Sequence, residues 1–167
     1  MNIFVLDEDP NIAASMQCDK HVVKMILESA QMLCSVYPEG VAPYKKAFYN
    51  HPCTRWVRES SENWSWLVCH AKGLCAEYTR RYEKIHKSEK VITWCASEPV
   101  VVKGELTPFA QAMPDHYKVS GDAVQAYRNY YIGDKARFAK WKESSLVPEW
   151  FSVGVLESGL VSDVPVI

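Results

Sequence analysis

The feature that most constrains this chain is the stretch over residues 13–33, AASMQCDKHVVKMILESAQML. Wrapped as a helix at about 100° per residue, its polar side chains fall within an arc of roughly 80°. They are Gln17, His21, Lys24, Glu28 and Gln31. A surface helix normally has a broader polar face, so this pattern favours a mostly buried helix whose polar stripe lines a pocket. The alternative is a surface helix with an i,i+4 pair between Lys24 and Glu28.

The apolar side of the same helix is expected to face the core, through Val22, Val23, Ile26, Leu27, Ala30 and Leu33. Asp9 followed by Pro10 is typical of a helix start. The pattern therefore predicts one helix over about 10–36, ended by the YPEG sequence at 37–40. Before it, the apolar residues 2–6 form a strand or an extended lead-in.

Helical spacing recurs in the rest of the chain. It predicts a helix over about 51–85 that kinks or is capped again at residues 60–62, a shorter helix over 86–97, and one from 121 to 141 that Gly133 weakens. Residues 98–117 contain three prolines and are expected to form a long ordered loop. The fold class is therefore mainly α, a single compact helical domain over 1–167. The tail over 151–167 is expected to be partly disordered or to lie over the body.

Composition narrows the classes of function. An apolar content of 48% and a charged content of 23% are ordinary for a soluble globular protein. The chain contains no apolar run of about 18 residues, and its start, MNIFVLDEDP, does not resemble a secretory signal. We expect a cytoplasmic protein without a membrane partner, in the host cytoplasm if a phage encodes it. The six cysteines include no CxxC pair, which favours reduced and mostly buried thiols over a disulfide framework or zinc site. We expect no metal and no cofactor.

Two groups of residues could carry chemistry. The first is His21, Lys24 and Glu28 on the polar stripe, where a carboxylate among apolar neighbours can act as a general acid or base and a half-buried lysine as a nucleophile. The second follows His51 and Pro52, where Arg55 and Arg58 share the first turn of a helix. Guanidinium groups at a helix start suit a phosphate, although surface pairs with Glu59 or Glu62 would explain them too.

Two further groups suit a nucleic acid. The net charge is −1, so any such binding requires a local basic patch. The one dense basic run contains Arg80, Arg81, Lys84, His86, Lys87 and Lys90. It could bind a phosphate backbone, or it could be a solvated helix end. Aromatic residues beside Arg128 could stack on bases, although most are better explained as core. They are Trp56, Trp64, Trp66, Tyr127, Tyr130 and Tyr131.

Three motifs in order give the chain a family resemblance. They are HVVKMILE at 21–28, His-Pro at 51–52 followed by Arg-Trp at 55–56, and EYTRRYEKIHKSE at 77–89. This order resembles the phage pyrimidine-dimer DNA glycosylases of the endonuclease V type and their bacterial relatives, over roughly residues 10–90. The whole sequence also looks like a phage protein.

The resemblance implies a compact helical fold that cleaves the N-glycosidic bond of a damaged pyrimidine and then breaks the DNA strand. The family nucleophile is the α-amino group at the mature N-terminus, which here would be that of Met1. The assisting helix glutamate corresponds to Glu28, and the family histidine to His21. This chain departs from the family at residue 2, which is Asn, and in the arginines that flank the family glutamate. Glu28 could instead activate water, without strand cleavage.

An amine mechanism makes a geometric demand. A straight helix from Asp9 to Glu28 is about 28 Å long, whereas five extended lead-in residues reach only about 17 Å. We therefore predict a helix break near residues 15–18, or a lead-in that returns along the helix.

Three functions remain open on the sequence. The first is a DNA N-glycosidase that excises a modified or damaged pyrimidine. The second is an N-glycosidase or binder of a free nucleotide or nucleoside, and the third is a non-catalytic phage protein that binds a host protein. For DNA or a nucleotide, the expected binding residues are His51, Arg55, Arg58, Arg80, His86, Lys87 and Arg128. The sequence does not indicate the oligomeric state.

Overall fold

The computed structural model describes residues 1–99 and 101–159. Across these residues the chain forms seven α-helices and no strand, which confirms the mainly α prediction. The α-helices are α1 (Pro10–Met16), α2 (Asp19–Cys34), α3 (Pro52–Glu59), α4 (Ser61–Tyr82), α5 (Glu89–Ser97), α6 (Ala123–Tyr130) and α7 (Glu149–Ser158). Two short 3₁₀ segments, η1 (Asp115–Tyr117) and η3 (Ser144–Leu146), and one π-helical turn, η2 (Tyr131–Lys135), complete the described elements.

Local capping explains where three helices begin. The Asp9 carboxylate accepts the N–H groups of Asn11 and Ile12 at the start of α1, and Pro10 takes the first helical position. The His51 ring caps α3 in the same way. Ser60 is extended, and its hydroxyl accepts the N–H of Asn63 at the start of α4. The predicted new cap at residues 60–62 is therefore confirmed.

The single helix predicted over 10–36 is wrong. The chain leaves the helix after Met16, and Gln17 and Cys18 are extended before α2 begins at Asp19. Neither Pro nor Gly stands at the break. The cause is Arg81 of α4, whose guanidinium donates to the carbonyl of Ser15 at 3.0 Å and to that of Gln17 at 2.8 Å. It satisfies carbonyl groups that a continuous helix would have paired internally.

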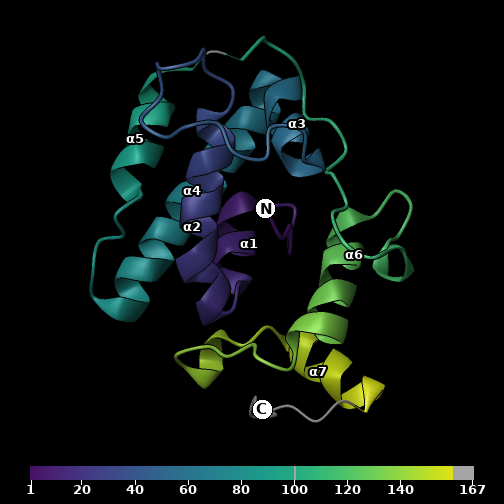
Figure 1. Cartoon of the computed structure of the whole chain (residues 1–167). Coiled ribbons are helices and arrows are strands. Elements are labelled where there is room, and N and C mark those ends of the chain that lie inside the picture. The colour runs from purple at the N-terminus through teal and green to yellow at the C-terminus, as the bar shows by residue number, and fades with distance from the viewer. Residues whose placement is uncertain (100, 160–167) are drawn as a thin grey trace.

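Helices α2 and α4 pack side by side, with α5 beyond them and α1 behind (Figure 1). The chain start lies in the middle of the molecule, between α2 and α6 (Figure 1). Phe4 accordingly contacts His21 of α2 and Tyr127 of α6. The expectation that the whole apolar side of α2 faces the core needs one correction. Val23 and Leu27 are 38% and 42% exposed, so that edge of α2 faces outward in the described part of the chain.

The predicted helix over 121–141 is shorter than expected. It becomes the π-helical turn η2 at Tyr131, and a Cβ at Gly133 would collide with the Tyr117 hydroxyl, so glycine allows Tyr117 to pack there. Part of the predicted tail forms α7, where Phe151 is fully buried. The rest of that tail, residues 160–167, lies outside the described part of the chain.

The predicted core is confirmed for most aromatic residues and thiols. Trp56, Trp64, Trp66, Tyr127 and Tyr131 are all buried, whereas Tyr130 is half-buried. Every cysteine is a free thiol, and all but Cys69 are buried. In the described part of the chain, every helix is too short or too polar to cross a membrane.

Candidate active site at the chain start

The lead-in over residues 2–6 is buried and turns tightly, with the Leu6 amide donating to the Phe4 carbonyl at 2.9 Å. The Asn2 side chain fixes it from within. Its Oδ1 accepts the N–H groups of Ile3 and Phe4 at 2.7 and 3.2 Å, and its Nδ2 donates to the Ala112 carbonyl at 2.8 Å. Phe4 then adopts a left-handed conformation, with φ of 56°. These contacts hold the first residue of the chain in one position.

The lead-in brings the Met1 amine to Glu28. The amine nitrogen lies 2.8 Å from Glu28 Oε1, which is the distance of a charge-assisted hydrogen bond. The lead-in runs back beside the helix break and α2, because Gln17 Nε2 donates to the Ile3 carbonyl at 3.1 Å and the Phe4 ring stacks on His21. The predicted approach of the amine to Glu28, with a break near residues 15–18, is confirmed.

This pair differs from an ordinary buried ion pair. Glu28 is 9% exposed, and its second oxygen, Oε2, has no hydrogen-bond partner in the described structure. The Met1 side chain is fully buried although the residue as a whole is half-buried, so its accessible part is the backbone that carries the amine. The pair therefore leaves one buried carboxylate oxygen, Oε2, without a partner beside the amine.

His51 borders the same pair from the start of α3. Its Nδ1 accepts the Cys53 N–H at 3.1 Å, so the proton of the neutral ring lies on Nε2. Burial and the positive Met1 amine lower the pKa of His51, while Glu28 acts in the opposite direction. The neighbouring Cys53 thiol lies 4.0 Å from Asn2 Oδ1, and burial raises its pKa to about 11. The thiol is therefore protonated at neutral pH, and His51 is the more accessible polar group.

The other members of the predicted catalytic stripe lie apart from this pair. His21 is two helical turns from Glu28, about 10 Å along α2. Its ring stacks on Phe4 with 4.1 Å between centroids, and its Nδ1 lies 2.6 Å from the Tyr131 hydroxyl. Burial, reinforced by nearby lysines, lowers the pKa of His21 to about 3. Lys24, between the two, is exposed. In the structure His21 supports the lead-in through Phe4.

The basic residues predicted to bind substrate divide into two kinds. Three of them already bind backbone carbonyls, namely Arg58 with Tyr49 (2.6 Å), Arg128 with Leu6 (2.9 Å) and His86 with Val23 (3.0 Å). Arg80 pairs with Glu77 at 2.6 Å. Arg55 and Lys87 are exposed. Neither Arg55 nor Arg58 forms an ion pair with Glu59 or Glu62 in the described structure, so the predicted alternative of surface pairs does not hold.

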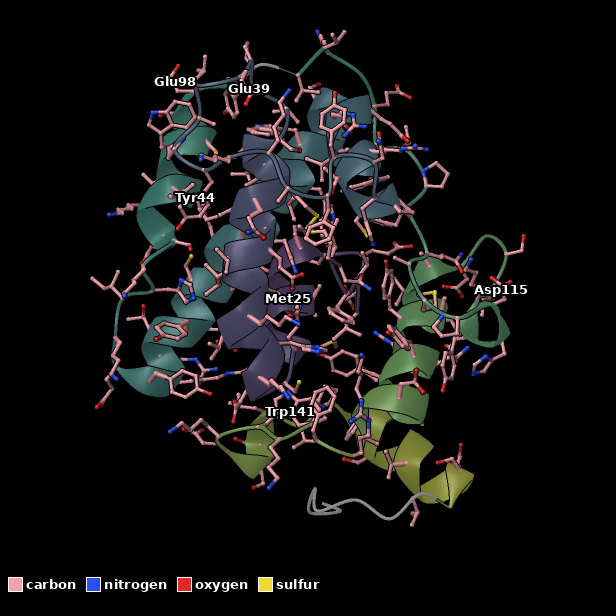
Figure 2. The ribbon with its side chains drawn as sticks, in the orientation of Figure 1. Met25, Glu39, Tyr44, Glu98, Asp115 and Trp141 are labelled. Carbon is pink, nitrogen blue, oxygen red and sulfur yellow. The ribbon has the colours of Figure 1, made fainter. Side chains whose placement is uncertain are left out.

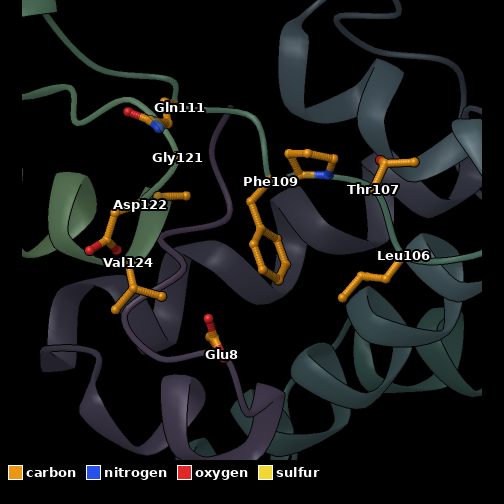
Figure 3. Close-up of a pocket in the computed structure, with 10 residues that line it drawn as sticks. Glu8, Leu106, Thr107, Phe109, Gln111, Gly121, Asp122 and Val124 are labelled. Carbon is orange, nitrogen blue, oxygen red and sulfur yellow. The ribbon is translucent and has the colours of Figure 1, made fainter.

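Two hollows in the surface differ in the charge of the residues that line them. A hollow of about 900 Å³ between the loop at Tyr44 and the start of α5 contains Lys87 and Lys90; Figure 2 shows Tyr44 on the α5 side of the molecule. The pocket in Figure 3, of about 390 Å³, lies where the loop at 106–111 meets the start of α6. Its charged lining residues are Glu8 and Asp122, so it would repel a phosphate backbone.

Sequence reasoning missed two residues that build this site. The Asn2 side chain accepts hydrogen bonds from the next two amides. Asn commonly forms such local side-chain to backbone hydrogen bonds, so its position directly after Met1 could have suggested this role. Arg81 was grouped with a basic run, yet its side chain is fully buried and it pairs with Asp19 and Glu77. No local pattern distinguishes it from Arg80. Among the described residues, no three His, Cys, Asp or Glu side chains gather closely enough to hold a metal ion.

The fold and the site define a helical protein whose own chain start meets a buried glutamate. Comparison with protein families gives the class a name. Residues 1–90 match the family described as pyrimidine dimer DNA glycosylase, and because this is more than half of the chain, the protein belongs to that family. Neither a curated protein nor a solved structure matches the chain.

Proposed function

We propose that the protein excises a damaged or modified pyrimidine from DNA, with the Met1 amine as nucleophile and Glu28 as the central carboxylate. The observation that carries the proposal is the 2.8 Å contact between the amine and Glu28, with one carboxylate oxygen unpaired. The family match supports DNA glycosylase chemistry in general.

The chemistry follows from what the two groups can exchange. Glu28 takes a proton from the amine, which frees the nitrogen lone pair to attack C1′ of the damaged nucleotide. The bond from C1′ to the base breaks, and the base leaves with its electron pair and gains a proton. The sugar ring opens as C1′ becomes an imine with the Met1 nitrogen. Loss of a proton from C2′ then expels the 3′ phosphate, and water releases the amine.

Cations around His21, about 10 Å along α2 from Glu28, support DNA as the substrate. Lys24 is exposed one helical turn from Glu28. The Lys135 ammonium lies 4.5 Å from the centre of the Tyr130 ring, and that of Lys20 lies 4.7 Å from the centre of the Phe138 ring. Cations that border half-buried aromatic rings can hold phosphates while the rings stack on unpaired bases. These cations are a local basic patch, which a chain with a net charge of −1 requires if it binds DNA.

The test is excision of a thymine dimer from a labelled duplex. We expect Glu28→Gln to slow base release by about 10²–10⁴-fold, the usual contribution of a general base, while the fold is retained. Glu39→Gln, at an exposed carboxylate in a loop, is the matched control and should leave the rate unchanged. Comparable turnover by Glu28→Gln would remove Glu28 from the mechanism.

Borohydride distinguishes the two ways in which Glu28 could act. An imine between Met1 and the opened sugar would be reduced to a permanent crosslink, which mass spectrometry would place on the first residue. Base release without a crosslink would mean that Glu28 activates water instead.

A further inference from the structure

The start of α3 leaves one hydrogen-bond donor unused beside the candidate active site. His51 caps α3, and its Nδ1 accepts the Cys53 N–H group at 3.1 Å. The neutral ring therefore carries its proton on Nε2, and in the described part of the chain this Nε2–H group has no acceptor. Because the cap fixes the ring and the residue is only half-buried, the donor is held in place and can be reached from outside.

The contacts of α3 with the lead-in place His51 near the pair of Met1 and Glu28. The Cys53 thiol lies 4.0 Å from Asn2 Oδ1, so the first turn of α3 packs on the residue that follows Met1. The chain start accordingly lies next to α3 in Figure 1. Burial lowers the pKa of His51, the Met1 amine lowers it further, and Glu28 raises it. Both charges of the pair therefore act on the ring.

The pair itself leaves the complementary group unused. Glu28 binds the amine through Oε1, while its buried Oε2 has no partner in the described structure. An unused acceptor on Glu28 and an unused donor on His51 thus border the same amine. A pyrimidine nucleotide attacked at C1′ fits this arrangement, because its carbonyl O2 lies two bonds from N1, the atom that leaves C1′. Negative charge develops on both atoms as the bond breaks.

We propose that His51 is a catalytic residue, whose Nε2–H group donates a hydrogen bond to O2 of the pyrimidine while the bond from C1′ to N1 breaks. The proposal rests on the proposed function. The electron pair of that bond passes to N1 and is shared with O2, and a donor fixed beforehand stabilises such charge as it develops. The base leaves as an anion and then takes a proton from water, so His51 keeps its own proton. A neutral ring suits this role, because a charged one would compete with the Met1 amine for Glu28.

Two substrates in duplex DNA test this role: a thymine dimer, which has a base to release, and an abasic site, which has none. His51→Asn keeps an acceptor where Nδ1 caps α3, since Asn is a good N-cap residue, but it removes the Nε2–H donor. We expect single-turnover cleavage of the glycosidic bond at the dimer, read as strand breaks after hot alkali, to slow by about 10²-fold or more. Borohydride crosslinking at the abasic site should stay within about threefold of wild type, because no base leaves there.

Two further variants serve as controls. His51→Gln places an amide donor near the position of Nε2 but loses the cap, so it should cleave the dimer faster than His51→Asn although its melting temperature is lower. His116→Asn makes the same exchange at an exposed histidine of η1 and should change neither rate. A melting temperature of His51→Asn equal to that of wild type would show that its slower cleavage is not a loss of fold.

The role of His51 is overturned if His51→Asn cleaves the dimer as fast as wild type, or if His51→Gln is no faster than His51→Asn. It is also overturned if the rates of His51→Asn fall equally on both substrates, since His51 would then only position the amine. If wild type leaves the dimer uncut, the proposed function fails, and the role of His51 fails with it. The ¹⁵N NMR spectrum of free wild type gives a check that needs no activity: a proton on Nδ1 in place of Nε2 would rule out this donor.

Discussion

Acid should unfold this protein partly through His21. Burial lowers the pKa of His21 to about 3, against 6.5 for an unperturbed histidine. Below pH 6.5 the histidine of the unfolded chain therefore binds a proton, whereas the buried native ring stays neutral. The free energy of unfolding consequently falls as the pH is lowered towards 3. At pH 5 the cost is about 2 kcal/mol, and it approaches about 5 kcal/mol near pH 3. His70, whose pKa burial lowers to about 4, adds a loss of the same sign.

The assay is urea unfolding at pH 7.5 and pH 5.0, for wild type and for His21→Asn. Asparagine does not titrate, and its amide can take the place of Nδ1 beside the Tyr131 hydroxyl. We expect the variant to be less stable at both pH values because the stack on Phe4 is lost. The informative quantity is therefore the change in unfolding free energy between the two pH values. It should be smaller in His21→Asn by about 2 kcal/mol. An equal change in both proteins would refute a buried neutral His21.

Two further predictions separate binding from structure. Arg55→Ala should weaken duplex DNA binding in fluorescence anisotropy, with an unchanged melting temperature. The slope of log affinity against log salt concentration should become shallower by about one, which corresponds to one lost phosphate contact. A fall in melting temperature at unchanged affinity would make Arg55 structural. Arg81→Ala should lower the unfolding free energy in urea by about 3–5 kcal/mol, because it leaves Asp19 without its cation and the carbonyls of Ser15 and Gln17 without their donor. Arg80→Ala, at the exposed neighbour, should cost less than about 1 kcal/mol, and equal losses would contradict this contrast.

Local signals were enough to predict most of the helices. Asp9 with Pro10, His51 with Pro52, and Ser60 each cap a helix through atoms within three residues, so the sequence alone locates them. The break at Gln17 and Cys18 has no such signal. It depends on a guanidinium supplied from α4, and only the requirement that the chain start reach Glu28 indicated its place.

The binding residues were harder to predict, for a related reason. A free arginine and an arginine that holds a loop look alike in sequence. Arg58 and Arg128 bind carbonyls at Tyr49 and Leu6, and the second of these partners is far away along the chain. The amine of Met1 could be placed in advance because chain length limits its reach. Chain length sets no such limit on the direction in which a long arginine side chain points.

The lead-in is held from outside the part of the chain that matches the family. The Ala112 carbonyl accepts the Asn2 amide group at 2.8 Å, and Arg128 donates to the Leu6 carbonyl at 2.9 Å, whereas the family match ends at residue 90. The chain therefore positions its reacting groups partly from outside the matched residues, in addition to the contacts that Asn2 and His21 make within them. Changes around Ala112 or Arg128 can shift the first residue against Glu28 while leaving α2 intact. For protein engineering, the second half of the chain can be varied to adjust the position of Met1 relative to Glu28. A site transplanted to another protein needs this half as well as the first.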